Sequence, residues 1–396
     1  MENIHETQPE VRQKVPQLLG VMAAEGVLME VEGEFRLQTT EGSAWESEFR
    51  SRLASAKNSE AALASQRAQL LARAVQTELS SLAILHGQSR ERRSVSVHQG
   101  LSDPPKDTGL TVWVRDGFSD TESSLIQHIQ SLDPTNPTVH VLIPKKRADD
   151  LKATLATLLA AQETLNFLGN PTNPEGKDAR ASMETRRAQA QRKVDDILSE
   201  LVHGGRVFLS GGQELPSIAL KETVTNACSQ VLEGLYHRFS QADSPNWNSV
   251  YKKAKEGNAD ALKSTGYQGD PEKHPVAIAL IQEIGAGKKG SELVAKFTAP
   301  PYGWPKDAVD ATLTTLVCTN HLMARLNGAP LSLADMDQRK ASQADYRLQH
   351  PVLNATQKLK VKKLFQEAEY KFTPGEELAA APNFVTLLKR LMEDAG

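Results

Sequence analysis

Cysteine and long hydrophobic runs are almost missing from this chain. Only Cys228 and Cys318 occur among 396 residues. Both lie among apolar residues at helical spacing, so the sequence predicts buried, reduced thiols and no disulfide framework. No apolar run approaches the roughly 20 residues of a membrane helix. The N-terminal segment MENIHETQPEVR has neither the apolar core nor the basic leader of a targeting peptide. We therefore expect a cytoplasmic protein that does not contact a membrane.

Charge of one sign and aromatic residues are also scarce. The 46 Lys and Arg residues are balanced by 49 Asp and Glu residues, which gives a formal net charge of -3. Because nucleic acids are bound chiefly through clustered Lys and Arg, any DNA contact must be local. Phe, Trp and Tyr make up only 5% of the chain, whereas Ala, Leu, Gln and Glu are abundant. This composition favours helices, and the length favours two or three domains.

The sequence lacks the motifs of several enzyme classes as well. It contains no G-x-x-x-x-G-K-[ST] phosphate loop, no H-x-x-x-H or C-x-x-C metal spacing and no G-x-S-x-G nucleophile elbow. We therefore predict no catalytic residue, no metal site and no bound cofactor in these residues.

Hydrophobic periodicity predicts a helix-rich α+β protein. Asp, Ser, Pro and Asn between Gln241 and Trp247 indicate a linker, and Asn327-Gly328 is a hairpin turn signal. We expect five regions: a partial winged-helix-like unit with a hairpin turning at Gly33 (1–40), a long helix or helical hairpin connector running to about His86 (41–92), a small α/β domain with a short parallel-type sheet (93–240), a winged-helix-like helical domain (241–335) and C-terminal helices (336–396).

The middle region reads as alternating strands and helices. Leu110–Val114 is a fully apolar strand, Ser119–Glu122 is a capping box that opens a helix, and Val139–Ile143 is the next strand. This order predicts a βαβ unit with parallel strands. A further short strand is expected at Arg206–Leu209.

Three loops carry groups that could meet a phosphate or another small ligand. LSGGQ (Leu209–Gln213) is identical to a sequence that contacts nucleotide phosphate in ABC-type ATPases. Because no phosphate loop accompanies it, we favour a glycine turn between a strand and a helix, and keep Ser210, Gly211, Gly212 and Gln213 as a candidate ligand loop. Asp116 follows a buried strand, where α/β proteins often place ligands, although Asp120 fits the helix start. Lys288 and Lys289 in GAGKKG could touch phosphate or a partner, or simply connect two helices.

Two segments are similar to one protein family. GAGKKGSELVAKFTAPPYGWPKDAVD (Gly285–Asp310) and RVFLSGGQE (Arg206–Glu214) resemble the large P-loop protein of bacterial BREX phage-exclusion systems, the BrxC/PglY family. The likeness extends from LLGVMAAEGVLME near the start to about Ser332. Because that family is an ATPase, the resemblance places this chain after the ATPase module, with Met1 beginning a fragment. It implies phage defence alongside a methyltransferase and other BREX proteins, with ATP and magnesium bound only by the missing module.

We therefore expect a non-catalytic assembly region that docks other defence proteins or itself. Tyr302 and Trp304, in the corner PPYGWP, are candidate partner contacts, and pinning the corner onto its own domain is the equal alternative. A basic C-terminal helix could contact DNA phosphates through Lys358, Lys360, Lys362 and Lys363. Two further hypotheses are a DNA-binding winged-helix module, whose third helix is however poor in base-reading residues, and a cryptic nucleotide-binding domain around Asp116 and LSGGQ.

Overall fold

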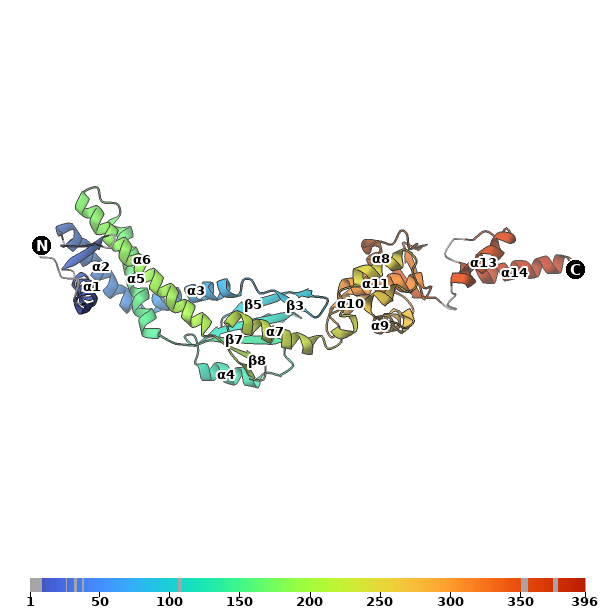
Figure 1. The fold of residues 1–396 in the computed structure, drawn as a ribbon, viewed down its shortest axis with the longest axis horizontal. Coiled ribbons are helices and arrows are strands. Elements are labelled where there is room, and N and C mark those ends of the chain that lie inside the picture. Colours follow the sequence, from blue (N-terminus) through green and yellow to red (C-terminus); the bar gives the residue numbers. More distant parts are fainter. Residues whose placement is uncertain are drawn as a thin grey trace. The chain divides into compact units, whose positions relative to one another are not determined.

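The computed structural model describes residues 9–25, 27–31, 34–37, 39–105, 109–349, 355–372 and 377–395. In these ranges the chain is helix-rich with small mixed sheets, so the predicted α+β class is confirmed (Figure 1). Its contacts gather into two compact units. The first comprises residues 1–82, 96–105 and 111–227, and the second comprises 83–95, 106–110 and 228–396.

The helical part of the first unit begins with a helix and a hairpin. The elements are α1 (Pro9–Ala24), β1 (Leu28–Val31), β2 (Glu34–Leu37), α2 (Thr40–Asn58), α3 (Glu60–Leu79), α5 (Ala148–Leu168) and α6 (Pro174–His203). The predicted hairpin is confirmed, because β1 and β2 pair antiparallel, and its turn residue Gly33 lies outside the described residues. The connector is two helices, because Ser59 leaves the helical conformation between α2 and α3. Trp45 and Phe49 of α2 form an apolar core with residues of α5 and α6.

A five-stranded sheet completes the first unit. The strands are β5 (Val95–Gln99), β6 (Leu110–Asp116), β7 (Thr138–Ile143), β8 (Arg206–Leu209) and β9 (Glu214–Leu215), and they lie side by side in chain order. The helices here are α4 (Glu122–Ser131) and α7 (Leu220–Leu235), and α7 from Cys228 onwards is assigned to the second unit. The predicted βαβ unit is confirmed, since β6 and β7 are parallel neighbours joined through α4. The sheet is mixed rather than parallel-type, because β8 pairs antiparallel with both β7 and β9. Leu125 and Ile129 of α4 pack on Leu142 and Phe208, so α4 covers one face (Figure 1).

The second unit builds its own core around helix α11. Its elements are α8 (Trp247–Lys255), α9 (Pro275–Ile284), β10 (Lys288–Lys289), α10 (Gly290–Thr298), α11 (Lys306–Cys318), β11 (Leu322–Leu326), β12 (Ala329–Pro330), α12 (Gln338–Gln343) and β13 (Asp345–Leu348), with 3-10 helices η1 (Phe239–Ala242), η2 (Ala261–Thr265) and η3 (Pro271–Lys273). The sheet order is β10-β13-β11-β12. The predicted turn at Asn327-Gly328 is confirmed, since β11 and β12 flank it as an antiparallel pair. Strand β13, which lies beyond the expected boundary at residue 335, pairs with both β10 and β11.

The expected linker at 241–247 is wrong. Ala242 and Trp247 are buried in the core of the second unit, and the indole N–H of Trp247 donates to the Ala242 carbonyl at 2.7 Å. The polar residues of this stretch form a tight bend over that core, so composition alone misread it.

A short hairpin that the sequence reading missed also belongs to the second unit. The helix expected to reach His86 ends at Leu79, and β3 (Ile84–His86) and β4 (Glu91–Arg93) follow as an antiparallel pair. The carboxylate of Asp243 accepts hydrogen bonds from the backbone N–H groups of Gln88 and Ser89 at 2.8 and 2.7 Å. These contacts fix the hairpin turn to the start of the C-terminal segment.

Arg93 is the main anchor of that hairpin. Its guanidinium lies 4.4 Å from the ring centre of Tyr236 and 5.2 Å from that of Phe239, and it donates to the Gly303 carbonyl. His86 stacks on Phe239 with ring centres 3.8 Å apart. Burial, and then the charge of Arg93, lower the pKa of His86 to about 4. Cation–π and stacking contacts therefore hold β3 and β4 against the end of α7 and η1.

Two helices end the described chain. Helices α13 (Ala355–Glu367) and α14 (Glu377–Ala395) pack through Phe365 and Phe384, whose ring centres are 4.7 Å apart. Tyr370 and Phe372 complete this small aromatic cluster.

Candidate functional site

The LSGGQ loop lies in a hairpin between two strands. The backbone N–H of Leu209 donates to the Gln213 carbonyl at 2.8 Å, and Gly211 and Gly212 have φ values of 87 and 94°. Two consecutive positive φ angles suit glycine because they cost other residues steric strain. The next helix, α7, begins only at Leu220. The predicted turn from strand to helix is therefore wrong, and the loop has no helix N-terminus to offer a phosphate.

The polar groups of this loop are used inside the protein. The Ser210 hydroxyl donates to the Thr138 carbonyl at 3.1 Å, and the Gly211 N–H donates to the Ile129 carbonyl, near the end of α4, at 3.1 Å. A Cβ atom on Gly212 would clash with the side chain of Gln130. The loop residues thus fasten α4 to the sheet, which accounts for the Ser-Gly-Gly sequence without a ligand.

Ser210 ends a buried chain of hydrogen bonds that begins at Arg115. Arg115 Nη1 lies 2.7 Å from Nδ1 of His128, and Nη2 lies 3.4 Å from Nδ1 of His140. Because a guanidinium only donates, both Nδ1 atoms must accept, so each imidazole is neutral with its proton on Nε2. His140 Nε2 then donates to the Ser210 hydroxyl at 3.2 Å. The order of donors fixes the tautomer of both histidines.

Burial governs the charges of this network. Desolvation lowers the pKa of Arg115, and the negative charges of Asp103 and Asp120 partly offset this by raising it. Burial, followed by the charge of Arg115, lowers the pKa of His140 to about 3. The Arg115 guanidinium also lies 4.2 Å from the ring centre of Trp113. A buried hydrogen-bond network of this kind holds a helix on a sheet.

The aspartates after β6 also have structural roles. Asp116 Oδ1 accepts from the backbone N–H groups of Phe118 and Ser119 at 2.9 and 3.0 Å. The N-cap of α4 is Thr121, whose hydroxyl accepts from Ser124 N–H, so the predicted cap at Ser119 is wrong. Asp120 accepts from the Ser124 hydroxyl at 2.9 Å, one turn into the helix. Both carboxylates thus stabilise the loop and the helix start.

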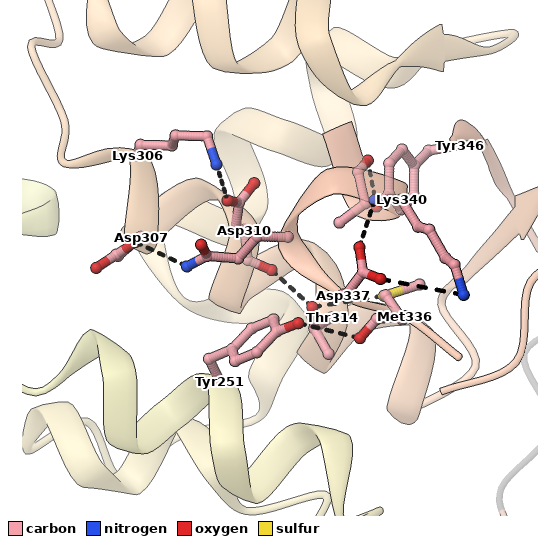
Figure 2. Close-up of polar contacts among 11 residues, drawn as sticks. Tyr251, Lys306, Asp307, Asp310, Thr314, Met336, Asp337, Lys340 and Tyr346 are labelled. Carbon is pink, nitrogen blue, oxygen red and sulfur yellow. Dashed lines mark hydrogen bonds and ion pairs between the residues drawn. The ribbon is translucent and has the colours of Figure 1, made fainter. Parts of the chain in front are cut away.

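The second unit contains a buried ion pair on α11, shown in Figure 2. Asp310 is 1% exposed, and its Oδ2 accepts from Lys306 Nζ at 2.7 Å, whereas its Oδ1 has no hydrogen-bond partner. Nearby, the Tyr251 hydroxyl donates to the Met336 carbonyl at 3.0 Å. Burial raises the pKa of the Asp310 carboxyl, and the charge of Lys306 partly offsets that rise. The pair links two successive turns of α11, whereas the Tyr251 hydrogen bond joins α8 to the segment before α12.

Helix α11 is enclosed by its own unit. Every residue from Ala308 to Leu316 is buried, and α8 packs along the helix. Thr312, Thr314 and Thr315 donate to carbonyls one turn back on the same helix. These residues of α11 therefore present little surface, in addition to being poor in base-reading side chains.

The aromatic corner is part of the same core. Trp304 is fully buried, stacks on Phe297 at 4.7 Å and donates its indole N–H to the Arg238 carbonyl at 2.9 Å. Tyr302 is half-buried, and its hydroxyl accepts from Arg238 Nη1 at 3.1 Å. Of the two roles expected for this corner, Trp304 has the internal one, because it pins the corner onto its own domain. Its side chain presents no surface to a partner.

The candidate lysines lie on two separate elements. Lys288 pairs with Glu283 at 3.4 Å, and Lys289 is exposed at the end of β10, so GAGKKG does connect two helices, α9 and α10. On α13, the side chains of Lys360, Lys362 and Lys363 are exposed, whereas that of Lys358 lies outside the described residues.

The sequence did carry a signal for the two buried polar clusters. Arg115 and His140 interrupt otherwise apolar strands, and Asp310 occupies a position on α11 between apolar residues. A charged residue in a buried element usually needs an internal partner, so these three positions were a signal of internal networks that the sequence analysis did not use.

In the described part of the chain, no helix is long and apolar enough to cross a membrane. The same residues include no group of three or more His, Cys, Asp or Glu side chains placed to hold a metal ion.

Comparisons with known proteins assign no family to this chain. No protein-family model, no curated protein and no solved structure matches the sequence.

Proposed function

We propose that this chain is a non-catalytic assembly region of a BREX phage-exclusion ATPase. It docks other defence proteins, or a second copy of itself, while a P-loop module outside these residues binds ATP and magnesium. The proposal is supported by the resemblance of Gly285–Asp310 and Arg206–Glu214 to the BrxC/PglY family. It is also supported by the internal use of the polar groups in LSGGQ and around Asp116, which are satisfied within the fold.

The observation that carries the proposal is the exposed apolar face of α14. Leu391 and Met392 are 54% and 76% exposed, and the other exposed apolar residues of this helix are Val385, Leu387 and Leu388. Contiguous apolar surface of this kind is typical of sites that contact another protein. Helix α1 has a second such face, formed by Val15, Leu18, Val21 and Met22.

Co-purification with the remaining proteins of a phage-exclusion system tests this proposal. We expect the chain to retain at least one of them, and the double change Leu391→Glu, Met392→Glu to abolish that retention without lowering the melting temperature. The control is Lys389→Glu, Arg390→Glu, which also adds two carboxylates at exposed positions of α14 but keeps all its apolar side chains. Retention by neither the parent nor any variant, or equal retention by both double variants, would contradict an assembly role for α14.

A DNA-contacting role is the second candidate, because of the element order in the second unit. The elements run in the order α9, β10, α10, α11, β11, β12, α12 and β13, and the sheet order β10-β13-β11 is consistent with a winged helix. With α11 enclosed, any contact would be to phosphates only, through residues such as Lys289. Duplex DNA titrated at several salt concentrations tests it: binding that weakens steeply with salt, and less steeply in Lys289→Ala, would favour this candidate.

The nucleotide-binding hypothesis gains no support from the geometry, since Ser210 and Gly211 are bonded to Thr138 and Ile129. A melting temperature that does not change with ATP and magnesium is the expected result.

A further inference from the structure

A groove in the first unit lies outside the candidate ligand loops described above. It has a volume of about 480 Å³ and runs between α1, α2 and α6. The wall residues on α2 extend from Glu46 to Leu53, and those on α6 from Ser182 to Gln189. Each set covers eight residues, so its ends are seven steps apart, which is about 10 Å or two helical turns at 1.5 Å per residue. The groove therefore follows two neighbouring helices for the length of two turns.

The groove has an apolar floor, and the charged side chains of its lining have a net positive charge. Phe49 and Leu53 supply the apolar surface. The charged side chains in its lining are Arg50, Arg186 and Glu46, so two positive charges and one negative charge leave a net charge of +1. Glu46 holds both arginines in place, at 3.0 Å from Arg50 Nε and 2.8 Å from Arg186 Nη1. Arg186 also lies 4.4 Å from the ring centre of Phe49.

Helix α1 borders the groove with small residues only. Its contributions to the lining are Gly20 and Ala23, and a Cβ atom added to Gly20 would meet no other atom within 4 Å. The larger apolar residues of α1, such as Leu18 and Val21, are exposed instead. The side of α1 that faces the groove thus leaves room beside an apolar, positively charged surface.

We propose that this groove binds one amphipathic, acidic helix of a partner protein. Apolar side chains at positions i, i+4 and i+7 would span its two turns and contact Phe49 and Leu53, as in other complexes that lay a helix in a groove. A carboxylate beside them would form charge-assisted hydrogen bonds with the guanidinium groups of Arg50 and Arg186. This inference rests on the proposed assembly function and names the chemistry of one partner surface, which is distinct from α14.

A designed peptide pair tests the proposal on the full chain. The probe is a fluorescein-labelled helical peptide of about 20 residues, or about 30 Å, with leucines at i, i+4 and i+7 flanked by glutamates. Its twin has lysines in place of the glutamates. Fluorescence anisotropy should show that the acidic peptide binds at least about tenfold more tightly than its twin.

Two glycine substitutions provide the test variant and its matched control. Gly20→Leu places a side chain into the open space beside the groove and favours the helix, so it should weaken peptide binding by about tenfold or more without lowering the melting temperature. Gly234→Leu makes the same change in α7, where an added Cβ also meets no atom within 4 Å, and should leave binding unchanged.

Three results would overturn the proposal. The first is equal affinity of the chain for the acidic peptide and its lysine twin. The second is unchanged affinity of the acidic peptide for Gly20→Leu. The third is displacement of the acidic peptide by free glutamate, which would assign the groove to a small anion. Failure here is distinguishable from failure of the assembly function, because co-purification is read through the α14 variants. Peptide binding without co-purification would support the groove proposal and contradict the assembly function. Co-purification without peptide binding would do the opposite.

Discussion

The buried pair of Lys306 and Asp310 gives the most discriminating prediction. Replacement of Lys306 by Met keeps the length of the side chain but leaves the Asp310 carboxylate without its ammonium donor. Asp310 Oδ1 already has no partner, so in Lys306→Met both oxygens of a carboxylate that is 1% exposed would be unpaired. We therefore expect this single change to destabilise the second unit.

The expected loss follows from the exposure of the two partners. Removal of one member of a fully buried ion pair costs about 3–5 kcal/mol. Lys306 is 46% exposed, so solvent already screens part of the attraction and the expected loss is about 2 kcal/mol. Asp310→Asn alone removes the buried charge together with the pair, and should change stability by about 1 kcal/mol or less. The double variant should recover at least half of the loss, because the two sites are coupled.

The loss should also depend on pH. Burial raises the pKa of Asp310, so the folded state holds this proton more tightly than the unfolded state does. The stability that this proton contributes is fully present below the unfolded pKa of about 3.9 and is lost as the pH rises through the folded pKa. Lys306→Met removes the charge that opposes the shift, so the difference from the parent should be small near pH 4 and largest at neutral pH.

Urea unfolding measures these differences through the fluorescence of Trp247 and Trp304, which lie in the same core as Asp310's helix. Parallel curves are needed for the parent, both single variants and the double variant at both pH values. The reasoning is refuted if the double variant loses as much as the two single losses summed, or if Lys306→Met loses as much at pH 4 as at pH 7. Either result would mean that the carboxylate is not an unpaired buried charge.

Three further predictions concern other buried groups. Ser210→Ala leaves the Nε2–H of His140 unpaired and should cost about 1–3 kcal/mol in thermal unfolding, while a loss near zero would contradict the network. Trp304→Phe keeps the stacking on Phe297 but removes the donor to Arg238, so calorimetry should show a loss of about 1–3 kcal/mol. Burial raises the pKa of the Cys228 thiol to about 12, so a thiol reagent at pH 8 should label Cys228 only after denaturant is added; rapid labelling of the native protein would show that the thiol is accessible.

The parts of the fold that were predictable depend on local signals. Strand alternation with a turn residue was sufficient for β1 and β2 and for the turn at Asn327-Gly328. Fully apolar strands around an amphipathic helix were sufficient for the parallel pair β6 and β7. In each case the paired strands follow one another among the strands of the chain, so the local pattern and the structure coincide.

The parts that were not predictable depend on distant partners. Residues 84–93 form strands because Arg93 meets Tyr236 and Asp243 meets the hairpin turn, and neither partner lies near in sequence. The turn of LSGGQ was assigned to a following helix because the groups that hold it, on Thr138 and Ile129, lie far back in the sequence. Similarly, the prolines and aromatics around Trp304 suit an exposed loop or a core corner, and its hydrogen bond to the distant Arg238 carbonyl decides between them.

The hairpin β3–β4 has a consequence for how the protein can be divided. Residues 83–95 interrupt the chain of the first unit and are assigned to the second, so no single cut of the backbone yields two intact pieces. A fragment starting at Cys228 would leave the rings of Tyr236 and Phe239 without Arg93 and the Asp243 carboxylate without its two amide donors. Supplying residues 83–95 as a separate synthetic peptide should restore such a fragment, in the manner of split-protein complementation.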